Sequence, residues 1–145
     1  MHVRGASHFA QDAIRNTQDC EEICVQTAQY CLEVGGSHAD AMHVRMLQDC
    51  ADICETAARI VLRGSQHQVD LAAACAAICE ACAASCEKFI GDPQMKACAN
   101  QCRLCAAACR QLMANSTSES SFRASFQSSG QHASASSVAN FTGPR

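Results

Sequence analysis

Aromatic residues are scarce in this chain of 145 residues, which has no Trp, one Tyr and five Phe. Three of the Phe, namely Phe122, Phe126 and Phe141, lie in a Ser-rich stretch near the C-terminal end. The length favours a single domain, and little aromatic material is left for its core. Because the sequence contains 13 Cys, cysteine must fill much of the interior instead.

Excess positive charge and long apolar runs are also missing. The net charge of −3 gives no basic footprint for nucleic acid. No apolar run approaches the roughly 18 residues that span a bilayer, and residues 1–11 lack the apolar centre of a secretory signal. We therefore expect no nucleic-acid partner and no membrane partner. The protein is expected to be cytoplasmic as the sequence stands, or exported if a signal has been removed.

Few residues interrupt the first three quarters of the chain, where the strong breaks are Gly35-Gly36, Gly64 and Gly91. The segments between them have helical composition. They predict four helices, over residues 7–34, 37–63, 65–90 and 93–114. Because the connections are short, neighbouring helices must run antiparallel. The predicted fold class is all-α, an up-down-up-down four-helix bundle formed by residues 1–114.

Local signals mark two of the helix starts and the end of the bundle. Ser37 opens a capping-box pattern, and Asp92 is expected to cap a helix whose first position is Pro93. From Asn115 onward the sequence is rich in Ser and has no apolar period. This composition predicts that residues 115–145 form a disordered tail.

All the cysteines fall in one frame that is used once in each predicted helix. The frame is read at positions 0, 4, 7 and 11 from the first cysteine of each helix. In chain order it contains Cys20, Cys24, Thr27 and Cys31; Cys50, Cys54, Ala57 and Val61; Cys75, Cys79, Cys82 and Cys86; and Cys98, Cys102, Cys105 and Cys109. The recurrence indicates an internal repeat of one helical unit.

The frame has a geometric meaning on a helix. At about 100° per residue its four positions lie within an arc of roughly 60°, and at about 1.5 Å per residue they extend over roughly 16 Å. Four such rows would face one another inside the bundle. Two further positions flank each row: Ile23, Ile53, Ile78 and Gln101 at position 3, and Ala28, Ala58, Ala83 and Ala106 at position 8. We expect the Ile to seal the seams between helices and the Ala to let helices approach closely.

Several interpretations of the cysteines can be weighed. Buried Cys is a common small core residue, but thirteen on four matched rows exceed that role. Disulfides are disfavoured because thiols at i, i+3 and i+4 on a straight helix are poorly placed for bridging. Structural zinc needs closed sets of four ligands. The spacing also matches a ferredoxin iron–sulfur run only weakly.

Cu(I) fits the pattern better. It is a soft ion that prefers thiolate ligands, it needs only two or three ligands, and one thiolate can bridge two ions. Cu(I) replacing thiol protons one for one leaves the core near neutral, which Zn(II) at the same loading would not. The sequence therefore predicts several Cu(I) per chain, with all thirteen cysteines as ligands.

The helices of pattern C-x3-C-x2-C-x3-C resemble those of the bacterial copper storage proteins, over roughly residues 7–114. The resemblance implies storage of Cu(I) rather than catalysis, and assembly into a homo-oligomer, a tetramer in exported members. It also implies a cluster of His and Met at one end of the bundle.

Soft ligands continue the cysteine row of the second helix toward its start. We call the end of the bundle that contains Cys31, Cys86 and Cys98 the mouth. His38, Met42 and Met46 are spaced at i, i+4 and i+8 there, with His43 as the alternative to Met42. Met95 lies three residues before Cys98. These five are candidates for metal uptake at the mouth, because thioether and imidazole bind copper less strongly than thiolate.

At the opposite end an ordinary apolar plug is expected from Phe9, Val61, Leu71, Leu112 and Met113. The other histidines, His2, His8, His67 and His132, are expected to be solvated.

No catalytic pattern stands out, so an enzyme is not expected. Two alternatives to copper storage stay open, a zinc or cadmium buffer of the metallothionein type and a thiol-disulfide redox protein. A copper donor or acceptor protein is a possible partner in the first case.

Overall fold

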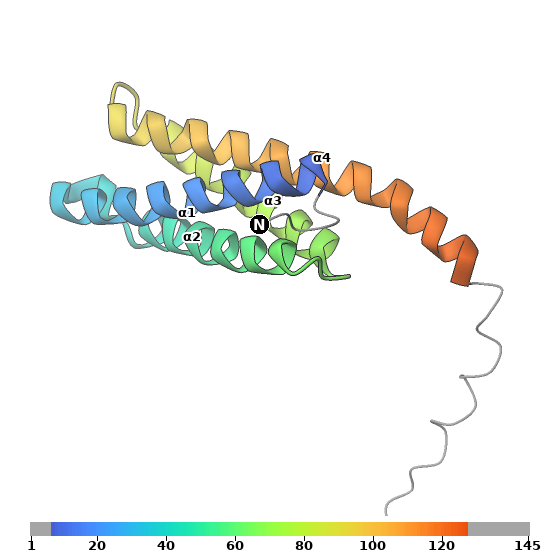
Figure 1. Cartoon of the computed structure of the whole chain (residues 1–145). Coiled ribbons are helices and arrows are strands. Elements are labelled where there is room, and N and C mark those ends of the chain that lie inside the picture. Colours follow the sequence, from blue (N-terminus) through green and yellow to red (C-terminus); the bar gives the residue numbers. More distant parts are fainter. Residues whose placement is uncertain (1–6, 128–145) are drawn as a thin grey trace, which may run out of the picture.

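Four α-helices form the molecule over the residues that the computed structural model describes, which are 7–127, with side chains through residue 116. The elements are α1 (His8–Val34), the short 3-10 helix η1 (Gly36–Ala39), α2 (Ala41–Leu62), α3 (Gln68–Glu87) and α4 (Pro93–Gln127). Each α-helix packs against two others, in the order α1, α2, α3, α4 and back to α1 (Figure 1). The predicted up-down-up-down bundle is confirmed.

The helix starts agree with the sequence at α4 and differ at α2. Asp92 Oδ1 accepts hydrogen bonds from the backbone N–H of Gln94 at 3.0 Å and of Met95 at 3.2 Å, as its capping role requires. Ser37, in contrast, is not the cap of α2. It lies within η1, and Asp40 caps α2 by accepting from His43 N at 3.3 Å. The extra turn at η1 moves the helix start downstream of the capping-box pattern.

The last helix is longer than predicted. α4 continues to Gln127 instead of ending near Ala114, and it projects beyond the other three helices (Figure 1). Its sequence contains no Gly and no Pro after Pro93, so no residue forces the helix to stop at the edge of the bundle. The rest of the predicted disordered tail, residues 128–145, lies outside the described residues.

Small side chains build the core. Among the described residues, the largest fully buried side chains are Leu47, Met95 and Leu112, and most of the others are Cys and Ala. The four Ala at position 8 are 0–4% exposed. The three Ile at position 3 are half-buried and pack against the core. Both findings agree with the expectation that Ala lies where helices approach closely and that Ile covers the seams between helices.

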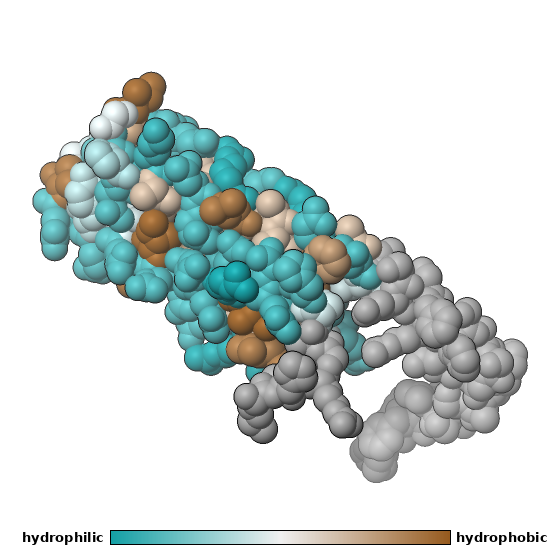
Figure 2. All heavy atoms as spheres, turned by 45° about the horizontal axis from the view of Figure 1, so that its top comes forward, coloured by the Kyte–Doolittle hydropathy of each residue, from teal (hydrophilic) through white to brown (hydrophobic). Residues whose placement is uncertain are grey.

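The outer face in view is mostly hydrophilic, with isolated hydrophobic side chains (Figure 2). Within the described residues, α3 alone is long and apolar enough to cross a membrane by length and composition. This is weak evidence for a span, because seven of its residues are Ala or Cys buried against the other helices. No apolar run of membrane-spanning length was expected from the sequence, and α3 was therefore overlooked. The apolar character of α3 comes from its core residues.

Candidate metal centre

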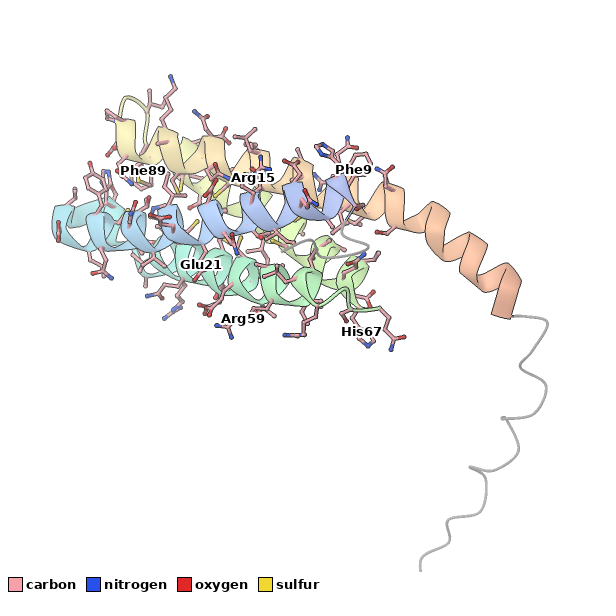
Figure 3. The ribbon with its side chains drawn as sticks, viewed as in Figure 1. Phe9, Arg15, Glu21, Arg59, His67 and Phe89 are labelled. Atoms are coloured by element: carbon pink, nitrogen blue, oxygen red, sulfur yellow. The ribbon has the colours of Figure 1, made fainter. Side chains whose placement is uncertain are left out.

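The thirteen cysteines form a single interior feature, which we call the sulfur core. Every one of them is 0–1% exposed, and their sulfurs lie inside the bundle between the helices (Figure 3). The helical frame explains this burial, because residues at positions 0, 4, 7 and 11 share one face and that face is turned inward on each helix. The rows predicted from the sequence therefore meet as expected.

Neighbouring sulfurs are in contact along the core. Cys20 Sγ lies 3.8 Å from both Cys50 Sγ and Cys102 Sγ. Cys54 Sγ lies 3.7 Å from both Cys75 Sγ and Cys79 Sγ. All thirteen are free cysteines, and these separations are far longer than a disulfide bond of about 2.05 Å. The sulfurs are thus close enough to share a metal ion without being bonded to one another.

Four groups of four sulfurs have all members within 4.8 Å of one another. The groups are Cys20, Cys50, Cys54 and Cys79; Cys20, Cys24, Cys50 and Cys102; Cys24, Cys82, Cys98 and Cys102; and Cys54, Cys75, Cys79 and Cys105. The first group shares two cysteines with the second and two with the fourth, and the second shares two with the third. The core is therefore a continuous array of overlapping ligand sets. Such an array suits ions that bridge between thiolates.

Three frame positions on α1 and α2 lack sulfur. Thr27 is fully buried, and its hydroxyl accepts a hydrogen bond from Gln94 Nε2 at 2.9 Å. Ala57 and Val61 are 1% and 5% exposed. Because α3 and α4 carry four cysteines each, that pair of helices supplies more sulfurs than α1 and α2.

Burial holds the thiols in their neutral form. Burial, followed by the charge of Asp92, raises the pKa of Cys31 to about 11. Hydrogen bonding to Cys105 and Cys75, followed by burial, raises the pKa of Cys109. A set of thirteen buried thiolates without counter-charge would be prohibitively costly. Burial therefore favours the protonated thiol throughout the metal-free core, whereas hydrogen bonds from neighbouring cysteines lower the pKa of Cys20, Cys50, Cys75 and Cys98.

At the mouth, one histidine and one methionine reach the sulfur core. His43 is 6% exposed, and its Nε2 lies 3.5 Å from Cys31 Sγ. The Cys31 thiol donates to Met95 Sδ at 3.6 Å. Burial lowers the pKa of His43, and the neutral imidazole that results is the form that binds metals. Cys31, His43 and Met95 thus converge as three soft ligands.

The other three mouth candidates are placed differently. His38 Nε2 lies 2.9 Å from Asp92 Oδ2 and does not contact a cysteine among the described contacts. Met46 is half-buried against the core. Met42 is 76% exposed. The buried face of α2 continues from Cys50 through Leu47 to His43, so of the two alternatives, Met42 and His43, it is His43 that lies on this face.

Several residues that support the mouth were not predicted. Ser85 Oγ lies 2.6 Å from His43 Nδ1 and fixes the ring so that Nε2 points at Cys31. The Phe89 ring packs on both His43 and His38, with centroids 4.8 and 4.3 Å apart, and Figure 3 places it at the mouth end. The Tyr30 hydroxyl donates to Asp92 at 2.8 Å. Such contacts between helices leave no mark in local sequence spacing.

The opposite end is apolar, as expected. Val61 and Leu112 are buried, and Phe9, Leu71 and Met113 are partly buried and pack against the core. Phe9 lies at the end from which α4 projects (Figure 3). His8 and His67 are exposed, while His2 and His132 lie outside the described residues.

Together the fold and the sulfur core define a class of protein, the helical bundle that holds soft metal ions on buried thiols. Residues 6–114 match the family model described as "Csp: Copper storage protein". The chain belongs to the copper storage protein family. No curated protein matches it.

Solved structures of similar proteins agree with this membership. A protein from Nitrosospira multiformis is 39% identical, with a TM-score of 0.69 over 73% of this chain and 95% of that one. The Cu(I)-bound copper storage protein of Bacillus subtilis is 33% identical, with a TM-score of 0.67 over 72% and 97%. A copper storage protein from Streptomyces lividans, loaded with 10 copper equivalents, is 28% identical, with a TM-score of 0.70 over 79% and 91%.

Proposed function

We propose that this protein stores Cu(I), holding many ions at once on the thiolates of the sulfur core. The observation that carries the proposal is the continuity of that core, in which thirteen free cysteines are buried along the bundle and four overlapping groups of them form a connected array. A catalytic or structural metal site needs three or four ligands. A row of overlapping ligand sets serves capacity instead.

Ligand type and charge select Cu(I) as the cargo. Thiolates suit this soft ion, and ions with two or three ligands that share bridging sulfurs make the capacity approach about one Cu(I) per cysteine. Each Cu(I) replaces one thiol proton, so the filled core keeps the charge of the empty one. The buried core can therefore be filled without accumulating charge in a medium that solvates it poorly.

Uptake is assigned to the mouth, through His43, Met95 and Cys31. Imidazole and thioether bind Cu(I) more weakly than thiolate does, so an ion held there moves downhill to the cysteines beyond. His38 and Met46 serve as outer contacts of this path, and exposed Met42 is its outermost soft ligand. A copper donor or acceptor protein would dock at this end.

We infer that the protein forms a homo-oligomer, a tetramer by family resemblance, and that it stores copper in the cytoplasm. Sedimentation of the metal-free and the filled protein measures the assembly, and a monomer in both states would contradict it.

Titration of the reduced, metal-free protein with Cu(I) against a chelator of known affinity tests the proposal. We expect about ten or more Cu(I) per chain and the release of about one proton per ion near neutral pH. Helical content should change little, because backbone hydrogen bonds of the helices do not depend on metal. Saturation at three or four ions, or a proton count near zero, would overturn the storage function.

A further inference from the structure

Four sulfurs around one centre are the ligand set of a divalent ion as well. A tetrahedral thiolate site with metal–sulfur bonds of about 2.3 Å has sulfurs about 3.8 Å apart. In the group of Cys54, Cys75, Cys79 and Cys105, four of the six Sγ–Sγ distances are 3.7, 3.7, 3.9 and 3.8 Å, and the other two are within 4.8 Å. Four of the six sulfur pairs thus already have the spacing that such an ion requires.

The second group of this kind shows the same spacing. Cys20 Sγ lies 4.0 Å from Cys24, 3.8 Å from Cys50 and 3.8 Å from Cys102, and Cys24 lies 3.8 Å from Cys102. These distances are set by the packing of α1, α2 and α4, which carry the four cysteines. A divalent ion would therefore enter without rearrangement of the helices.

We propose that the copper-free sulfur core binds Zn²⁺ or Cd²⁺ at closed tetrathiolate sites, and that it holds two such ions per chain. The limit comes from the overlap of the four groups. Any three of the four groups include two that share cysteines, so three ions cannot bind at once. Three different pairs of groups have no cysteine in common, so two ions can. Thirteen cysteines would otherwise provide three sets of four. The inference does not depend on copper storage.

The binding of each divalent ion releases protons from the thiols and leaves a negatively charged site in the core. One M²⁺ displaces four protons from four thiols and forms M(S-Cys)₄ with a net charge of −2. Two sites thus place four negative charges in the core, which is a second reason for a low capacity. Four Cu(I) can later replace one divalent ion on the same sulfurs, giving a neutral Cu₄(S-Cys)₄ unit and free M²⁺.

The overlap predicts which single substitutions matter. Cys54 and Cys79 belong to the same two groups, and Cys24 and Cys102 belong to the other two. Replacing Cys54 with Ser leaves two groups that share Cys24 and Cys102, so only one ion can bind. Replacing the adjacent Cys75 with Ser removes a single group and leaves a pair without shared cysteines, so two ions still bind.

Cd²⁺ titration of the full-length, reduced, copper-free protein tests the proposal, with a competing chelator that removes weakly held ions. Absorption by Cd–thiolate bonds reports the number of ions bound. We expect two for the native chain and for Cys75→Ser, one for Cys54→Ser, and none for the double variant Cys24→Ser with Cys54→Ser, which still has eleven thiols. Circular dichroism checks that each variant folds, and Cu(I) titration of the same samples measures storage separately. Three Cd²⁺ per native chain, or equal losses in Cys54→Ser and Cys75→Ser, would overturn the proposal.

Discussion

Met42 and His43 are adjacent in the sequence and lie in opposite environments. Met42 is 76% exposed, whereas His43 is 6% exposed and contacts Cys31. One residue turns a helix position by about 100°, which is enough to move a side chain from the core to the surface. Ligand type alone therefore does not identify the residues that serve the mouth.

Replacing His43 with Gln and Met95 with Leu should slow the transfer of Cu(I) from a coloured chelator several-fold, because both soft ligands next to Cys31 are lost. The total Cu(I) bound should stay within about three ions of the native value, since the thiolates that dominate affinity are unchanged. Stopped-flow absorbance measures the rate, and an equilibrium titration measures the capacity. Leu104, which is 58% exposed and has no part in the uptake path, provides the control: Leu104→Gln should transfer copper at the native rate. Equal rates in all three proteins would mean that copper enters elsewhere.

Cys31 also makes the stability of the metal-free protein depend on pH. Its pKa is raised from 9.0 to about 11, first by burial, so folding favours the protonated thiol. The resulting stabilisation is complete below pH 9 and is lost as the pH rises through 11. Urea unfolding under reducing, oxygen-free conditions should show a falling midpoint across this window. In Cys31→Ser the fall should be smaller, and a midpoint that rises with pH would contradict the argument.

At the scale of elements, α4 is longer than the part of it that contributes to the core. Its last cysteine is Cys109, yet it continues to Gln127. Ser116 contacts Gln68 of α3 at 3.4 Å, beside the apolar end of the bundle. The extension contributes no cysteine, so it lies outside the storage function proposed here.

Ending the chain after Ala114 should leave the Cu(I) capacity unchanged, because every cysteine is retained. The helical signal in circular dichroism should fall, because the part of α4 beyond Ala114 is removed. Copper titration and far-ultraviolet circular dichroism of the two proteins provide the measurements. Reduced capacity would show that the extension supports the bundle.

Asp92 joins three elements at the mouth. It caps α4 through two backbone hydrogen bonds and accepts from His38 and Tyr30 through its other oxygen. Asp92→Ala should therefore lower the urea midpoint more than Asp40→Ala, which removes a single cap bond of 3.3 Å. Equal effects would show that the contacts with His38 and Tyr30 add nothing to stability.

For the whole molecule, the sequence predicted the bundle and the sulfur core because both follow from one periodic pattern. A residue repeated at 0, 4, 7 and 11 has its direction fixed by helix geometry. The mouth was predicted less well, because its contacts join residues far apart in the chain, such as Ser85 with His43 and Tyr30 with Asp92. The end of α4 was predicted near Ala114 because the Ser-rich composition after it is typical of disorder, although residues 115–127 contain no Gly and no Pro.

The scarcity of large side chains in the core has a consequence for the lifetime of the protein. The metal-free core rests mainly on Ala and Cys, so each buried side chain contributes little apolar area. Ions that bind only the folded chain stabilise it by mass action. A full store should then resist unfolding and proteolysis, whereas an empty one is exposed to both. The supply of copper would in this way determine how long each molecule of the storage protein survives.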